Sequence, residues 1–168
     1  MEQKEFNTIV KENHEKVYSL FRGMVQTHEE ADDLTQETFI KVYKNLGKFK
    51  GNSKMFTWIY RIAVNTGLNY LRKERLKHFI GLEKADLPAE NQDSDISDDT
   101  KAFLNKAIKK LPSKQQMVVM LRSYQEMSYR EIANIMNISI NSAKVNYSHA
   151  VRNLKNILEK MGVGYEAL

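Results

Sequence analysis

Apolar residues recur at every third or fourth position along most of the chain, which is the spacing of amphipathic helices. Two such stripes occupy residues 6–25 and 31–46. Thr27 and Glu30 stand between them in the Thr-x-x-Glu arrangement of a capping box, which predicts the start of the second helix. Gly47 is expected to end that helix. The N-terminal quarter is therefore predicted to be a pair of helices.

A third helical stripe follows, with Ser53 as its expected cap and an expected end near Arg75. Residues 80–99 break the pattern, because they are polar, acidic and almost without apolar periodicity. Such a segment would be unusual inside a compact domain, so we interpret it as an acidic flexible linker. It divides the chain into an N-terminal domain, residues 1–79, and a C-terminal domain, residues 100–168.

Helical spacing returns in the C-terminal domain. Ser113, Ser128 and Ser139 each precede an apolar stripe and are expected to cap a helix. Asn137 suits a left-handed turn between the last two helices. A short helix, a turn of about four residues and a longer helix together make a helix-turn-helix across residues 127–154. No strand pattern is present, so the fold is predicted to be all-α, with two small helical domains.

The composition supports this interpretation and narrows the chemistry. Only 2 Pro and 7 Gly interrupt the helices, and 42% hydrophobic residues are enough to form a core. The absence of cysteine excludes disulfides and thiolate metal sites, and it fits a reducing compartment. The N-terminus is charged, and no stretch approaches the roughly 20 apolar residues of a membrane span. We expect a cytoplasmic protein with no membrane insertion of its own.

Charge is distributed unevenly along the chain. Residues 80–99 hold one Lys against seven Asp or Glu, and the blocks on both sides carry an excess of Lys and Arg. The overall net charge is +5. Two basic blocks suggest a polyanionic partner such as nucleic acid, although many helical proteins have similarly charged surfaces.

The predicted helix-turn-helix places a polar row on the outward side of its second helix. Amides and hydroxyls in that position can hydrogen-bond base edges, and a lysine can contact a phosphate or a guanine. The alternative is an ordinary helical hairpin with a solvated polar face. The residues of this row are Asn141, Ser142, Lys144, Asn146, Ser148 and His149.

Two further groups of residues precede the linker. Asp32, Asp33, Gln36 and Glu37 share one helix face, which is explained either as a solvated helix start or as a docking face for a basic helical partner. Residues 49–75 mix aromatic with basic side chains, a combination that suits single-stranded nucleic acid, although several of the rings are expected to be core.

Enzymatic functions find little support in the sequence. The four histidines are far apart in sequence, and none stands in a zinc-binding arrangement. No phosphate-binding loop and no nucleophile turn of the Gly-x-Ser-x-Gly type is present. We expect no catalytic site, no metal and no cofactor.

Three segments resemble bacterial sigma factors. Residues 31–46, ADDLTQETFIKVYKNL, resemble the polymerase-docking segment, and residues 49–72, FKGNSKMFTWIYRIAVNTGLNYLR, resemble the segment that melts and reads the minus-ten promoter element. Residues 124–154 resemble the helix-turn-helix that reads the minus-thirty-five element. Their order, with an acidic linker between them, is similar to the two-domain extracytoplasmic-function group over roughly residues 5 to 160.

The resemblance implies a transcription initiation factor that binds core RNA polymerase, directs it to specific promoters and nucleates DNA melting. It implies docking to the coiled coil of the largest polymerase subunit through Asp32, Asp33, Gln36 and Glu37. It implies contacts to minus-ten DNA by Lys41, Phe49, Tyr60, Arg61 and Asn65. It implies contacts to minus-thirty-five DNA by Arg122, Asn141, Ser142, Lys144, Ser148 and His149.

Relatives of this kind are commonly held inactive by an anti-sigma factor, so such a partner is expected as well. The chain departs from the group at Asn141 and Ser142, where Gly-Thr is usual, and at Asn146 and Val151, where arginine is frequent. Fewer cations imply a weaker grip on phosphate at the upstream element. The alternative function is a stand-alone helix-turn-helix transcriptional regulator, which would leave residues 31–75 without a role.

Overall fold

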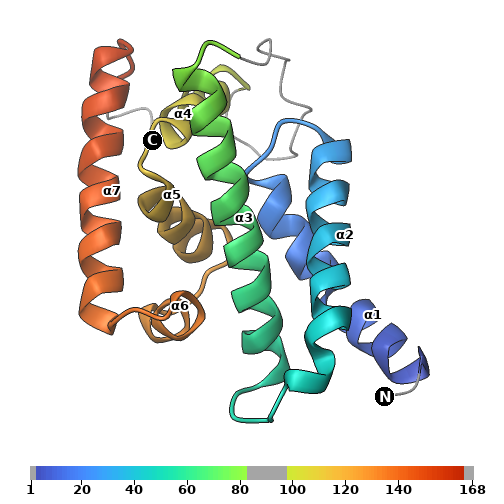
Figure 1. The fold of residues 1–168 in the computed structure, drawn as a ribbon. Coiled ribbons are helices and arrows are strands. Elements are labelled where there is room, and N and C mark those ends of the chain that lie inside the picture. The colour runs from blue at the N-terminus through green and yellow to red at the C-terminus, as the bar shows by residue number, and fades with distance from the viewer. Residues whose placement is uncertain (1–2, 83–97, 165–168) are drawn as a thin grey trace.

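The computed structural model describes residues 3–82 and 98–164. All regular structure in these two ranges is helical, which confirms the predicted all-α fold for this part of the chain. Figure 1 shows the arrangement of the helices. The elements are α1 (Gln3–Arg22), α2 (His28–Asn45), a 3₁₀ turn (Leu46–Lys48), α3 (Met55–Phe79), α4 (Asp98–Lys109), α5 (Ser113–Val119), a π-helical segment (Met120–Tyr124), α6 (Tyr129–Met136) and α7 (Ile140–Lys160).

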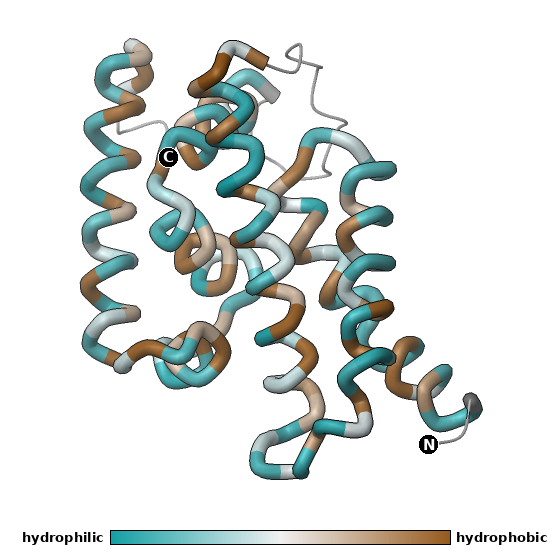
Figure 2. The backbone as a smooth tube through the Cα atoms, viewed as in Figure 1, coloured by the Kyte–Doolittle hydropathy of each residue, from teal (hydrophilic) through white to brown (hydrophobic). Residues whose placement is uncertain are grey.

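Helix α3 lies between the two halves of the molecule. Helices α1 and α2 pack on one side of it, and α5 and α6 pack on the other, with α7 outside them (Figure 1). Hydrophobic and hydrophilic positions alternate along the tube of α7, so one side of that helix faces the core (Figure 2). The buried apolar residues of both halves belong to one hydrophobic cluster.

Side-chain caps explain where several helices begin. Thr27 forms a capping box with Glu30 at the start of α2, and Ser128 forms another with Glu131 at the start of α6. The Ser139 hydroxyl accepts a hydrogen bond from the Ser142 amide at the start of α7. These three predicted starts are confirmed.

Two other predicted caps are wrong. Lys54, not Ser53, occupies the N-cap position of α3, without a side-chain hydrogen bond. Pro112 occupies that position in α5, so Ser113 is already the first helical residue. In both cases an extended N-cap backbone starts the helix without help from a hydroxyl. Helix α3 also runs on to Phe79, beyond the expected end.

The predicted linker, residues 80–99, lies mostly outside the described residues, because 83–97 are not among them. The N-terminal half, α1 to α3, and the C-terminal half, α4 to α7, pack closely at two glycines of the N-terminal half. A Cβ at Gly23, after α1, would overlap the terminal methyl of Met120. A Cβ at Gly67, in α3, would lie 3.0 Å from the terminal methyl of Met117. The missing side chains therefore let two methionines of the C-terminal half approach the N-terminal backbone closely.

Candidate polymerase and nucleic-acid interfaces

The acidic face of α2 is formed as the sequence predicted. The buried side of α2 leaves Asp32, Asp33, Gln36 and Glu37 on the opposite, exposed side. Glu37 accepts a hydrogen bond from the Lys41 ammonium at 2.7 Å, one helical turn away. The buried residues that orient the helix are Ala31, Leu34, Thr35, Thr38, Phe39 and Val42.

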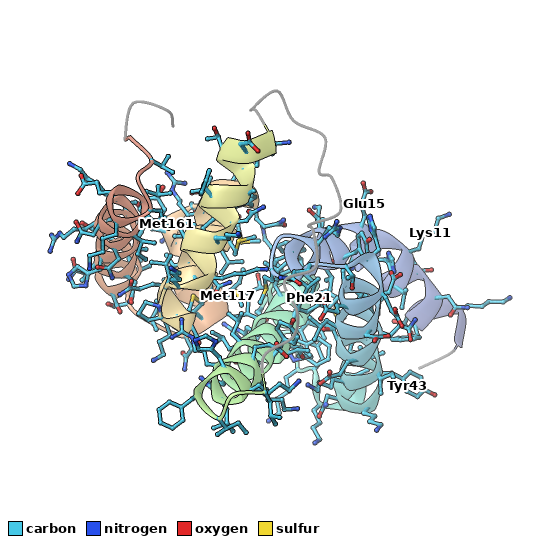
Figure 3. The ribbon with its side chains drawn as sticks, turned by 90° about the horizontal axis from the view of Figure 1, so that it is seen from above. Lys11, Glu15, Phe21, Tyr43, Met117 and Met161 are labelled. Atoms are coloured by element: carbon cyan, nitrogen blue, oxygen red, sulfur yellow. The ribbon has the colours of Figure 1, made fainter. Side chains whose placement is uncertain are left out.

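Two apolar side chains extend this face and were missed in the sequence analysis. Ile40 is 54% exposed and Tyr43 is 58% exposed. Figure 3 shows the Tyr43 side chain directed away from the body of the molecule, and its ring packs edge-on against Phe6 with centroids 5.0 Å apart. The signal was available, since steps of four and three from Gln36 lead to Ile40 and Tyr43. An acidic face that continues into apolar side chains suits a protein partner better than solvent.

Lys41 joins the acidic face to α3. Besides its contact with Glu37, its ammonium donates a hydrogen bond to the Thr66 hydroxyl at 3.1 Å. Thr66 is buried, and its neighbour Asn65 is exposed. The structure thus brings Lys41 close to the segment of α3 that carries Asn65.

Phe49 lies in the loop before α3, where its ring packs against Trp58 with centroids 5.2 Å apart. Both rings are half-buried. Trp58 therefore supports the Phe49 ring and takes part in packing. Part of the surface of each residue therefore remains accessible.

Tyr60 and Arg61 are brought against the C-terminal half of the chain. Tyr60 is fully buried, and its hydroxyl lies 2.9 Å from the Lys16 carbonyl and 2.8 Å from the Gln125 amide oxygen. Burial raises the pKa of the Tyr60 phenol, so it stays protonated and can donate. The Arg61 Nε donates to the Asn134 carbonyl in α6 at 2.9 Å.

The helix-turn-helix is confirmed in α6 and α7. Asn137 has φ 55° and ψ 48°, the left-handed conformation that turns the chain between the two helices. Ile132 and Ala143 are fully buried where the helices cross. Asn146 donates to the Ser142 carbonyl at 2.9 Å, so its amide is turned back onto the helix.

The predicted upstream DNA-contacting residues of α7 form an accessible polar row. Ser142 is half-buried at one end of the row. Asn146, which also belongs to the row, is half-buried. The remaining members are exposed, namely Asn141, Lys144, Ser148 and His149.

Arg122 lies in the π-helical segment rather than on α7. Its guanidinium donates to the Met127 carbonyl at 2.9 Å and covers the Tyr129 ring at 4.8 Å from the centroid. These contacts fix the half-buried side chain beside the helix-turn-helix. The sequence did not predict the π-helix, a geometry that often marks functional segments.

Neither a metal cluster nor a membrane span emerges from the described ranges 3–82 and 98–164. No group of three or more His, Asp or Glu side chains there is placed to hold a metal ion. No helix in those ranges has the length and apolar character that crossing a membrane requires.

Comparisons with known proteins agree on one family. The family model described as Sigma-70 region 2 matches residues 9–77, and that described as Sigma-70, region 4 matches residues 104–154. The chain is 32% identical over 155 residues to the ECF RNA polymerase sigma factor SigW of Bacillus subtilis, covering 85% of this chain and 83% of that protein. It is 33% identical over 156 residues to the ECF RNA polymerase sigma-E factor of Escherichia coli K12, covering 85% and 81%.

Two solved structures share the fold. The sigma factor RpoE of Bartonella quintana, in complex with the anti-sigma factor NepR, superimposes with a TM-score of 0.66 at 21% identity, covering 93% of this chain and 98% of that chain. CnrH, in complex with the cytosolic domain of CnrY, gives a TM-score of 0.66 at 18% identity, covering 95% and 90%.

Proposed function

Since this chain belongs to the extracytoplasmic-function sigma factors, we propose that it binds core RNA polymerase, directs the enzyme to specific promoters and nucleates DNA melting. The observation that carries the proposal is that one chain contains both the region 2 and the region 4 match in that order. The two working units are residues 1–79 and 100–168, joined by the acidic segment 80–99. The polymerase supplies the catalysis and its magnesium, and this chain acts as a factor rather than as an enzyme.

The acidic face of α2 is the proposed docking surface for the coiled coil of the largest polymerase subunit. Four exposed polar side chains and the apolar Ile40 and Tyr43 give it both charge and contact area. Charges at the rim steer the encounter, and buried apolar side chains supply much of the affinity. The polar residues are Asp32, Asp33, Gln36 and Glu37.

The outer surface around α3 is the proposed minus-ten site. Asn65 and the Phe49 ring are available to hold a base that leaves the DNA stack, which is the step from which melting proceeds. Lys41, Tyr60 and Arg61 are assigned to the sugar-phosphate backbone. Two of these three, Tyr60 and Arg61, contact the C-terminal half in this structure.

The helix-turn-helix is the proposed reader of the minus-thirty-five element. The exposed row on α7 offers amide, hydroxyl and imidazole groups to base edges and one ammonium to phosphate. Arg122 adds a cation beside it. The residues assigned to this contact on α7 are Asn141, Ser142, Lys144, Ser148 and His149.

The expected setting is the cytoplasm, where polymerase and DNA are found. An anti-sigma factor is a further proposed partner, supported by the two similar folds, which were each solved with another protein bound. The proposed role in transcription initiation does not depend on which protein that partner is.

Transcription with purified components tests the proposal. Sigma-free core polymerase, the purified chain and fragmented genomic DNA should yield transcripts from a defined set of start sites. Core polymerase without the chain is the control. Protection of DNA by the chain alone, with no transcripts when polymerase is added, would instead support the stand-alone regulator.

A further inference from the structure

A cavity of about 770 Å³ opens at the end of the molecule where α4 meets the last turns of α3 (Figure 1). Its walls come from the connection between α1 and α2, from the C-terminal part of α3, from α4 and α5, and from the end of α7. Ligand pockets in proteins commonly have volumes of roughly 300–1,000 Å³. None of the residues assigned to polymerase or DNA is among the described residues that line this cavity. It is therefore a separate space, large enough for a small organic molecule.

The inner lining of the cavity is apolar. Met24, Val25 and Leu71 are each at most 7% exposed, and Met161, at the end of α7, is half-buried. Phe79 is 87% exposed, which places it at the mouth. Aliphatic and thioether side chains adjust their shape to a flexible partner, whereas a planar ligand is best held between opposed rings. The lining therefore favours an unbranched hydrocarbon chain.

A buried polar side chain also belongs to the lining. Gln116 is only 2% exposed, and no residue in the described part of the chain forms a hydrogen bond with its side-chain amide. Every side-chain nitrogen or oxygen that is fully shut off from solvent in this part of the chain does have a partner. The Gln116 amide therefore opens onto the cavity. A buried amide without a partner is costly, and a ligand that accepts a hydrogen bond from it removes that cost.

Positive charge predominates around the cavity, where five cations face two carboxylates. Both carboxylates have other partners, since Glu74 pairs with Lys77 at 3.1 Å and Glu30 belongs to the capping box of α2. Lys106 and Lys110 are exposed and form no ion pair with any residue that the structure describes. They are therefore available to an anion. The five cations are Arg75, Lys77, Lys106, Lys109 and Lys110.

We propose that this cavity binds a small anion that carries an unbranched apolar chain, such as a medium-chain fatty acid. The hydrocarbon chain lies along the apolar lining and is removed from water there. The carboxylate accepts a hydrogen bond from the Gln116 amide and is attracted by Lys106 and Lys110. The proposal is independent of the proposed function, because the site includes no polymerase or promoter contact.

Calorimetric titration of the full chain separates the contributions of chain and charge. Decanoate, below its micelle concentration, should bind saturably at one site. Decan-1-ol lacks the charge and should bind about tenfold more weakly or worse, and acetate lacks the chain and should not bind measurably. Equal affinity for decanoate and decan-1-ol would refute the anion site. No saturable binding of decanoate would overturn the whole proposal.

The methionine methyl groups show where the ligand binds. Met24 and Met161 line the cavity, whereas Met127 and Met136 lie outside its described lining. In a chain with ¹³C-labelled methionine methyls, decanoate should shift the resonances of Met24 and Met161 and leave those of Met127 and Met136 unchanged. Shifts confined to Met127 and Met136 would place the ligand elsewhere and refute the assignment.

Substitutions test the two polar parts of the site. Lys106→Gln with Lys110→Gln should weaken decanoate binding about threefold or more and leave decan-1-ol binding unchanged. The control Lys4→Gln with Lys11→Gln removes the same charge from exposed positions of α1 and should bind decanoate as wild type does. Gln116→Met keeps the length without the amide and should also weaken binding, with circular dichroism to confirm folding. Wild-type affinity in the Lys106 and Lys110 variant, or an equal loss in the α1 control, would refute the site.

Discussion

Reversing charge on the acidic face of α2 should separate polymerase docking from folding. The double variant Asp33→Lys with Glu37→Lys replaces two exposed carboxylates by ammonium groups. Opposite a basic coiled coil, the new like-charge contacts should cost several kcal/mol of binding free energy. Because each 1.4 kcal/mol is a tenfold change, affinity for core polymerase should fall by about a hundredfold or more.

The cost to folding is much smaller. The contact between Glu37 and Lys41 is 2.7 Å long, but the Lys41 and Glu37 side chains are 39% and 52% exposed, so solvent screens it. Exposed pairs at this helical spacing contribute about 0.3–0.5 kcal/mol, and the repulsion of Lys41 by the ammonium introduced one turn before it is of similar size. The sum is about 1 kcal/mol, which should lower Tm by roughly 2–4 °C.

Competition with a labelled wild-type chain for core polymerase measures the binding loss, and thermal melting measures the stability loss. The matched control is Glu12→Lys with Glu15→Lys, which adds the same charge to exposed positions of α1. Wild-type affinity in the Asp33 and Glu37 variant would refute the docking assignment. An equal loss of affinity in the α1 control would mean that overall charge, rather than this face, governs binding.

Single substitutions at the two proposed DNA-binding surfaces and at one helix cap should have separable effects. Asn65→Ala should impair promoter opening more than polymerase binding, and permanganate reactivity of promoter thymines measures the opening. An equal defect on pre-melted templates would contradict a role of Asn65 in base capture. Lys144→Ala should reduce the slope of log affinity against log salt concentration by about one unit, which filter binding across a salt series measures. His149→Ala should instead relax the preference at one upstream base pair, which filter binding to a set of mutated promoters measures. Ser128→Ala should lower stability by about 1 kcal/mol through loss of the α6 cap. The Ser128 hydroxyl also donates to the Glu131 carboxylate, and hydrogen bonds from the Ser128 backbone and side chain lower the pKa of Glu131. The stability from this hydroxyl–carboxylate bond is therefore complete above the ordinary glutamate pKa of about 4.3 and is lost as pH falls through the lowered value. Chemical denaturation should show the difference between wild type and variant narrowing in acid, without vanishing, because the hydroxyl still accepts from the Glu131 amide.

Local rules were sufficient for much of the fold. Helix periodicity, the capping boxes at Thr27 and Ser128, and the left-handed Asn137 depend on residues within one or two turns of each other, so the sequence predicts them. The same holds for the exposed acidic face of α2 and the polar row of α7, since helical spacing decides which side chains share a face. The caps assigned to Ser53 and Ser113 failed because a proline or an extended backbone can begin a helix without a hydroxyl.

The packing of the two halves on each other was decided only in three dimensions. Periodicity places Tyr60 and Arg61 on α3, but it does not say that Gln125 and Asn134 will reach them from positions 65 and 73 residues away. The sequence likewise does not predict that Met120 packs against Gly23 and Met117 against Gly67. The helices and their chemically distinct faces are thus predictable from residue order alone, because they follow from short-range periodicity and capping. Which faces stay open to a partner is not predictable in this way, because burial depends on contacts between segments that are distant in the chain.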